Sequence, residues 1–387
     1  MKKLSYYENA IAIKSERTHS KHLRMVSDFY TTDKYQQLHF NSYDFLGLST
    51  HPHIKKTVIK YVLEWGVGTI QSRFHADHIK HHRKIESNLA DLTGKEEALL
   101  LPNSTLSLNL IFSALITPKM YVFVDRCCSP KIMKILIATK AKIVKYEHNN
   151  FSHLTRLLQK TEKNVAKWIV TESLFNISGN LLDVHALQEI ALEFGALTFV
   201  DDSNTVGMMG KYGMGHVSCR ADIDVIFGSL GKQLGSLGSF MGCCETIKTY
   251  LLTHSVELAD SSLVPPSILG AIKASIDLIP DMRQERENIL EIADLMRNSL
   301  KDHHFDIPSG QTHFIPIVFR TYDDYEKALQ ELLSQSIIIC TQQAPHNSIE
   351  EFSICAIVNA NHKKDDIENI VGALVSAQSK MTRCKVY

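Results

Sequence analysis

Lys232 and Asp201 are the residues whose chemistry the sequence suggests first. Lys232 lies in the glycine-rich segment FGSLGKQLGSLGSF, which follows the apolar run IDVIF, and Asp201 directly follows the apolar run LTFV. A reactive lysine that faces a carboxylate across a ligand is what pyridoxal phosphate requires, because the lysine forms a Schiff base and the acid keeps the pyridine nitrogen protonated. One loop and one further strand separate the two residues, so we expect them to lie side by side and hold this cofactor.

The phosphate of such a cofactor needs hydrogen-bond donors and a positive dipole end. Asn103, Ser104 and Thr105 precede the amphipathic run LSLNLIFSAL, so they would form a helix N-terminus, which is a natural anion site. The Ser229 hydroxyl would add a contact, and the glycines around Lys232 would let the backbone approach the cofactor closely.

Ordinary explanations for these residues remain open at this point. An aspartate after a strand often caps a turn, and a lysine in a glycine-rich loop is often solvated. A P-loop is excluded, because its GxxxxGK[ST] pattern requires glycine at position 226 and a hydroxyl at 233, where Ile226 and Gln233 stand.

The elements that must position these residues follow a βαβ rhythm. Strand-like apolar runs alternate with runs of helical periodicity, which predicts a mostly parallel sheet covered by helices on both faces, with ligands outside the carboxyl ends of the strands. The strand-like runs are EALLL, MYVFVD, AKIVKY, KWIVTE, ALTFVDD, DVIFGS and SFMGCC, and the helical ones are LSLNLIFSAL, SPKIMKILIATK, FSHLTRLLQKTE and DVHALQEIALEFG.

The alternation of strand-like and helical runs ends at Pro265 and Pro266, after which a long helical pattern runs to about Leu300. The runs HFIPIVFR, SIIIC and FSICAIVN, with helices from about Tyr322 and Lys364, then predict a small α+β domain. We therefore expect an N-terminal segment, 1–50, that packs with the small domain, a large cofactor-binding domain, 51–265, and a C-terminal part, 266–387, formed by the long helix and the small domain.

Composition excludes several classes of protein. The 387 residues carry 42 basic and 42 acidic side chains, so nucleic acid is not expected as a partner, and a small-molecule substrate is. Neither a signal peptide nor a transmembrane segment is evident, and the eight cysteines favour packed thiols in a reducing compartment. We expect a soluble, cytoplasmic protein without a metal, and interpret HADHIKHHR, with His78 and His82, as a solvated or interface helix face.

The order of several segments resembles the α-oxoamine synthases, which are fold-type I pyridoxal phosphate enzymes. The resemblance covers about residues 35 to 375, and SYDFLGL and YVLEWGVGT are most similar to serine palmitoyltransferase subunits. It rests on SYDFLGLSTHP, WGVGTIQSR, VTESLFNISGNLLDVHALQEIALEFGALTFVDDSNTVGMMGKYGMG and GSLGKQLGSLGSFMG. The family condenses an amino acid with an acyl-CoA and releases carbon dioxide.

The resemblance implies a role for five residues of this chain. Lys232 would be the lysine that forms the Schiff base, and Asp201 would contact the pyridinium nitrogen. Ser229 would bind the phosphate, and Ser104 and Thr105 would form the turn on the phosphate side.

Three positions depart from the family pattern around the cofactor. Ser129, in DRCCSPK, stands where the family has a histidine that stacks on the ring, so stacking is lost. Asn204, in DDSN, replaces the histidine that contacts the 3′-oxygen; it can donate a hydrogen bond but cannot carry charge. Asn176 stands where serine is usual.

A fourth departure concerns the substrate. The family binds the amino-acid carboxylate through an arginine, whose guanidinium fits that planar anion. Cys355 occupies the matching position, and there is no arginine between Arg320 and Arg383. A neutral thiol cannot replace the guanidinium.

The sequence leaves two hypotheses open. In the first, the chain is an active acyltransferase for a serine-like amino acid and an acyl-CoA, as in sphingoid-base synthesis, and an unusual donor without a free carboxylate is a variant of it. In the second, the chain is an accessory subunit of the long-chain-base type that pairs with a catalytic homologue. The family builds its sites between subunits, so we expect a homodimer or a heterodimer, in the second case at the cytosolic face of the endoplasmic reticulum.

Overall fold

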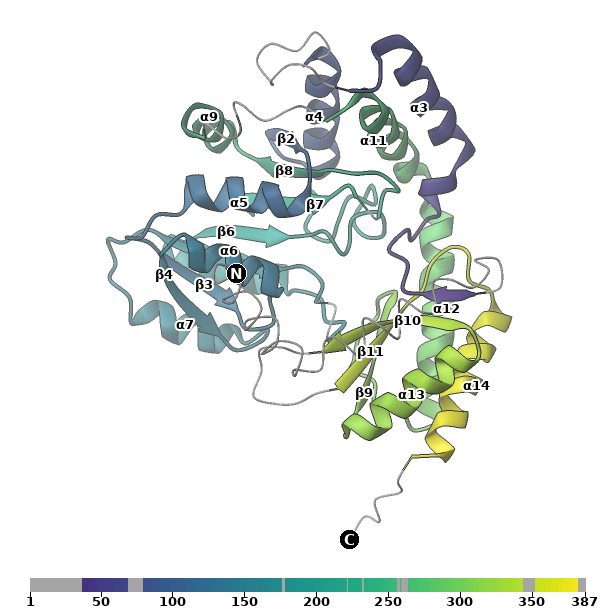
Figure 1. Cartoon of the computed structure of the whole chain (residues 1–387). Coiled ribbons are helices and arrows are strands. Elements are labelled where there is room, and N and C mark those ends of the chain that lie inside the picture. Colours follow the sequence, from purple (N-terminus) through teal and green to yellow (C-terminus); the bar gives the residue numbers. More distant parts are fainter. Residues whose placement is uncertain are drawn as a thin grey trace, which may run out of the picture.

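The computed structural model describes residues 37–68, 79–175, 178–220, 222–231, 233–255, 258, 264–343 and 352–381. Lys232 and Asn176, two of the site residues proposed from the sequence, lie outside these ranges. The described residues form a large α/β part and a smaller one, joined by helices (Figure 1).

The large part is built on a seven-stranded sheet with the order β2-β8-β7-β6-β5-β3-β4. Each apolar run that the sequence marks as a strand forms one, and all are parallel except β8, which runs antiparallel to both β7 and β2. The mostly parallel sheet is thus confirmed. The strands are β2 (Glu97–Leu101), β3 (Tyr121–Asp125), β4 (Lys142–Tyr146), β5 (Lys167–Glu172), β6 (Leu197–Asp201), β7 (Val225–Ser229) and β8 (Ser239–Cys243).

Helices cover both faces of this sheet because alternate strand residues point to opposite sides. On β5, Trp168 and Val170 enter one apolar cluster and Ile169 enters the other. The first cluster is closed by α5 (Ser104–Leu115), α6 (Pro130–Ala138) and α9 (Glu245–His254); helices α4 (Ile79–Thr93), α7 (Phe151–Gln159) and α8 (Val184–Phe194) pack on the second.

Local sequence fixes where several of these helices begin. The side chains of Asn103, Asn150 and Asp183 each accept a hydrogen bond from the backbone N–H three residues later, at the starts of α5, α7 and α8. Such caps satisfy an N–H group that has no acceptor within the helix. The caps therefore fix the residues at which α5, α7 and α8 begin.

The long helical pattern after Pro265 is two helices rather than one. Helix α11 (Pro266–Leu278) and helix α12 (Arg283–Asp302) are separated by the 3₁₀ turn η2 (Ile279–Asp281). Pro280 lies in that turn, and proline both lacks an N–H and disfavours helical backbone at the preceding residue.

The smaller part is a four-stranded sheet with the order β1-β10-β11-β9. Its strands are β1 (Leu38–Phe40), β9 (Phe314–Phe319), β10 (Ile337–Gln343) and β11 (Phe352–Ile357), and helices α13 (Tyr322–Ser334) and α14 (Lys364–Ser379) lie beside it (Figure 1). Strand β1 pairs with β10 in parallel, so Leu38–Phe40 belong to the same sheet as the C-terminal strands. After the short turn η1 (Leu48–Thr50), α3 (Pro52–Trp65) packs along α11.

Two surface expectations are wrong. His82 is fully buried, and its Nε2 lies 3.1 Å from the Val264 carbonyl oxygen, so that helix face is not solvated there. Cys219 and Cys244 are exposed, whereas Cys128 and Cys243 are packed thiols. Within the described ranges, no helix combines the length and apolar character needed to cross a bilayer.

Candidate active site

The carboxyl ends of four neighbouring parallel strands bring polar residues to one edge of the large sheet. Ser229 ends β7, Asp201 ends β6, Glu172 ends β5 and Asp125 ends β3. Glu172 pairs in register with Asp201, so their side chains come from adjacent strands at the same level. This is the edge at which such sheets bind ligands.

Asp201 and Glu172 form a buried carboxyl pair, with 7% and 6% of their surfaces exposed. One Asp201 oxygen accepts a hydrogen bond from the Ser203 N–H at 3.0 Å. Burial, and then the charge of Asp201, raise the pKa of Glu172 to about 8. Glu172 is therefore mostly protonated at neutral pH.

Ser129 is held by Glu172. Its N–H donates to Glu172 Oε1 at 2.5 Å, and its hydroxyl accepts from the Ile132 N–H at the start of α6. The residue at the position of the family's stacking histidine thus caps a helix beside the carboxyl pair. Through this bond Glu172 orients the turn that carries Ser129.

Asn204 and Ser229 connect the loops that follow the strands. Asn204 Nδ2 donates to the Leu174 carbonyl oxygen at 2.9 Å, which joins the loops after β6 and β5. The Ser229 N–H donates to Ser203 Oγ at 3.0 Å, and the Ser229 hydroxyl donates to the Gly231 carbonyl oxygen at 3.2 Å. To donate to a phosphate, the Ser229 hydroxyl would have to turn away from the Gly231 carbonyl oxygen.

The loop that includes position 232 is fixed at both ends. The N–H groups of Leu230 and Gly231 donate to the Gly238 carbonyl oxygen at 2.9 and 3.1 Å. Gly235 has φ +62°, and a Cβ atom there would lie 2.3 Å from the Ser49 backbone nitrogen. Glycine is therefore required for this close approach.

The start of α5 lies at the same edge. The Asn103 cap satisfies the Leu106 N–H, which leaves the Ser104 and Thr105 N–H groups without acceptors inside the helix. Ser239, which pairs in register with Ser229, donates its hydroxyl to Ser107 Oγ at 2.8 Å.

The structure thus brings together Ser229, Asp201, Asn204, Ser129 and the first turn of α5, which also holds Ser104 and Thr105. Within the described residues, a buried carboxyl group with one oxygen that accepts no hydrogen bond, two helix N–H groups without acceptors in the helix and a serine hydroxyl fit a pyridine nitrogen and a phosphate.

Tyr43, to which the sequence gave no role, faces this edge from the small part. Burial raises its pKa, and charge on Cys340, Cys355 and Glu172 would raise it further, so Tyr43 lies close to all three groups. Cys355 is 1% exposed on β11, and burial raises the pKa of its thiol. The position of the family's arginine is therefore a neutral, buried thiol. Tyr43 belongs to the small part and Glu172 to the large part, so the spacing of residues in the sequence could not indicate that they lie near each other.

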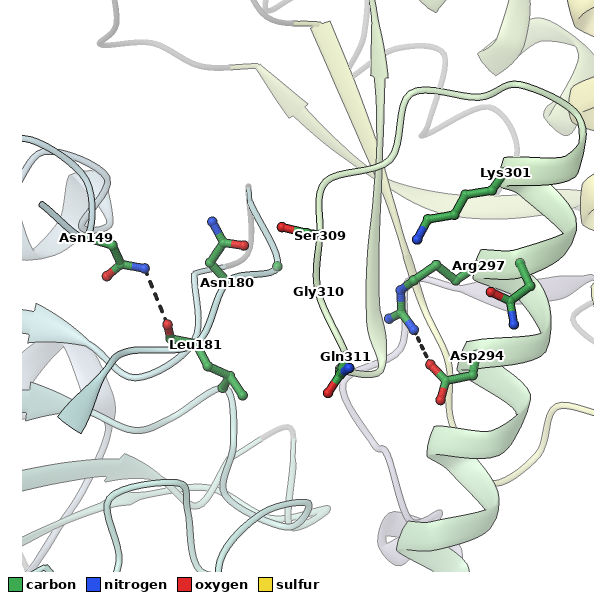
Figure 2. A pocket seen from close by; sticks show the side chains of 11 residues that line it. Asn149, Asn180, Leu181, Asp294, Arg297, Lys301, Ser309, Gly310 and Gln311 are labelled. Carbon is green, nitrogen blue, oxygen red and sulfur yellow. Dashed lines mark hydrogen bonds and ion pairs between the residues drawn. The ribbon is translucent and has the colours of Figure 1, made fainter. Parts of the chain in front are cut away.

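A separate polar pocket of about 660 Å³ lies between the Gly179–Leu181 segment and helix α12. None of the proposed site residues lines it. In Figure 2, Asn149 is bonded to the Leu181 carbonyl oxygen on one side of the pocket, and Arg297 is directed toward Asp294 of α12 on the opposite side. The Arg297 guanidinium also donates to the Thr312 carbonyl oxygen at 2.5 Å, so its donors are largely used within the chain.

Comparison with known proteins places this geometry in context. The chain matches the aminotransferase class I and II family over residues 35–374. An 8-amino-7-oxononanoate synthase from Geobacter sulfurreducens is 28% identical over 338 residues, which are 86% of each chain. Another, from Citrifermentans bemidjiense, is 28% identical over 354 residues, 90% of this chain and 91% of the relative.

Solved structures share the fold over nearly the whole chain. A structure of SPT with PLP superposes with a TM-score of 0.87 at 20% identity, covering 98% of this chain and 99% of that one. A serine palmitoyltransferase from Sphingomonas wittichii gives a TM-score of 0.85 at 19% identity, with coverage of 98% and 99%.

Proposed function

Because the chain belongs to the aminotransferase class I and II family, among the α-oxoamine synthases, we propose that it joins an acyl group from acyl-CoA to an amino acid with loss of carbon dioxide. Membership of this family makes it a pyridoxal phosphate enzyme, and the relatives named 8-amino-7-oxononanoate synthase support an acyltransferase. The choice of amino acid, and a serine palmitoyltransferase-like role in sphingoid-base synthesis, belong to the proposal.

The residues at the sheet edge would share the work as follows. The Ser104 and Thr105 N–H groups and the Ser229 hydroxyl would bind the phosphate, and Asp201 would contact the ring nitrogen. Lys232 would hold the cofactor and take the proton from the substrate's α-carbon. When bound, the cofactor supplies an electron sink for the carbanion that remains. Glu172, protonated, would orient the Ser129 turn without adding a second charge beside Asp201.

One observation carries this proposal: Ser229, Asp201 and the first turn of α5 meet at one sheet edge. The register of β7 with β8 and the Ser239 to Ser107 hydrogen bond fix that arrangement. A cap or turn role for Asp201 alone would not require a helix N-terminus at the same place.

Cys355 limits the choice of donor. A buried neutral thiol offers no charge to an amino-acid carboxylate. The donor's carboxylate, which the reaction must release as carbon dioxide, must then bind another group. The relatives named 8-amino-7-oxononanoate synthase favour a second candidate, synthesis of that compound.

Absorption spectroscopy of the purified protein tests the proposal. A cofactor joined to Lys232 gives a visible absorption band that borohydride bleaches. We expect this band in the wild type and in Lys119→Ala, an exposed lysine that serves as control, and not in Lys232→Ala. Addition of serine, glycine or alanine should then change the spectrum for the true donor only.

Two results would overturn the proposal. A colourless wild-type protein that gains activity only with a catalytic homologue would establish the accessory role instead. A band that persists in Lys232→Ala would place the covalent link on another lysine. Sedimentation of the coloured protein would decide between a homodimer, one of the two dimers expected from the sequence, and a monomer.

A further inference from the structure

Asp125, Cys127 and His148 form a cluster of three different metal-binding groups beside the candidate active site. Asp125 ends β3, Cys127 follows two residues later, and His148 follows two residues after the end of the adjacent strand β4. One ligand atom from each side chain lies within 4.8 Å of the others. We propose that this cluster binds a divalent transition-metal ion of the zinc type.

The ligand set and its dimensions suit such an ion. Zinc is bound in proteins by carboxylate, thiolate and imidazole at about 2.0–2.3 Å, so ligand atoms around one tetrahedral ion lie about 3.3–3.7 Å apart. His148 Nδ1 lies 3.1 and 3.2 Å from the two Asp125 oxygens. Shifts of about 1 Å or less would let all three groups reach one ion, with a fourth position for water.

The surroundings orient the ligands. Asp125 accepts hydrogen bonds from the Cys127 N–H at 2.8 Å and the Asn149 N–H at 2.9 Å. His148 Nε2 lies 3.1 Å from Ser178 Oγ, so with a metal on Nδ1 the Nε2–H donates to that hydroxyl. A metal-bound histidine usually has such a partner on its other nitrogen.

Burial is graded in a way that allows entry of an ion. Asp125 is fully buried, His148 has 19% of its side chain exposed, and Cys127 is half-buried. A histidine and aspartate pair accounts for a buried Asp125 by itself. That pair does not explain why the Cys127 thiol lies at the same point. Hard cations such as magnesium disfavour thiol ligands, so the thiol favours a zinc-type ion.

Zinc binding to the cofactor-loaded protein tests the proposal, independently of catalysis. After dialysis against metal-free buffer and addition of one equivalent of zinc, we expect one ion per chain, and X-ray absorption at the zinc edge should show one sulfur at about 2.3 Å. Cys127→Ser should remove the sulfur signal and lower zinc affinity at least about tenfold. Cys244→Ser, at an exposed thiol outside the cluster, should change neither.

Three outcomes would overturn the proposal: no zinc bound by the wild type, zinc bound without sulfur, or Cys127→Ser equal to the wild type. His148→Gln should also lose zinc. His148→Gln leaves the buried Asp125 carboxylate without its histidine partner and could unfold the protein for that reason. Cys127→Ala therefore serves as the second variant, because it removes a ligand while Asp125 and His148 remain paired.

Discussion

His313 is a buried base whose removal should change how stability depends on pH. The ring is fully buried against Phe45, with ring centres 4.2 Å apart, and neither ring nitrogen has a hydrogen-bond partner in the part of the chain that the structure describes. Burial lowers the pKa of His313 to about 3, against about 6.5 in an unfolded chain.

The sign and size of the effect follow from linkage. Below pH 6.5 the unfolded chain takes up a proton that the folded chain refuses, so stability is present above pH 6.5 and falls as the pH drops toward 3. A difference of about 3.5 pKa units corresponds to about 5 kcal/mol when the loss is complete, and to about 3 kcal/mol at pH 4.

Urea unfolding of wild type and His313→Leu between pH 7 and pH 4 measures this loss. The variant should lose about 3 kcal/mol less than the wild type over that range. Any packing cost of leucine is independent of pH and cancels in the slope. His254→Leu, at an exposed histidine, should follow the wild type. Parallel curves for wild type and His313→Leu would show that His313 titrates normally and would refute the assignment.

Three further changes test the site's framework. Glu172→Gln imitates the protonated acid; because the folded pKa is raised to about 8, wild-type stability should fall as the pH rises from 4.5 through 8, and the variant's should fall less in pH-dependent urea unfolding. Gly235→Ala should lower the free energy of unfolding by at least about 2 kcal/mol and weaken cofactor retention on dialysis, because its Cβ would meet Ser49. Gly372→Ala, in open space on α14, should instead raise the free energy of unfolding by up to about 1 kcal/mol. Equal effects of the two changes would contradict the close approach of Gly235 to Ser49. Asn103→Ala should cost about 1 kcal/mol in thermal unfolding through loss of the α5 cap, and an unchanged melting temperature would show that the cap is dispensable.

The sequence predicts the strands and most helices of the large part well, because their signals are local. The run KWIVTE is apolar enough to be buried on both faces, and it forms β5. The break at Pro280 was also readable from its residue type, but the apolar period continues past it into α12 and conceals it. For His82, the solvated alternative of the predicted solvated or interface helix face is wrong; its burial could not be foreseen because its partner, the Val264 carbonyl oxygen, is distant in sequence.

In the candidate site, too, some residues could be predicted from local signals and others could not. The positions of Asp201, Ser229 and the α5 turn follow from the rule that ligands meet strand ends, so spacing alone suggests them. Tyr43 and the convergence of Cys127 with His148 could not be predicted, because they depend on which strands become neighbours. Strands β3 and β4 adjoin only in the folded sheet.

The antiparallel strand β8 gives the glycine-rich segment an uncommon attachment. The chain leaves β7 at Ser229 and returns directly into β8 at Ser239, without the helical crossover that parallel neighbours need. The two strands that flank the segment, β7 and β8, are therefore paired with each other, and each has a second neighbour in the sheet. Detaching this segment would mean peeling apart the middle of the sheet, so amide protons on β7 and β8 should exchange with solvent only when the whole large part opens.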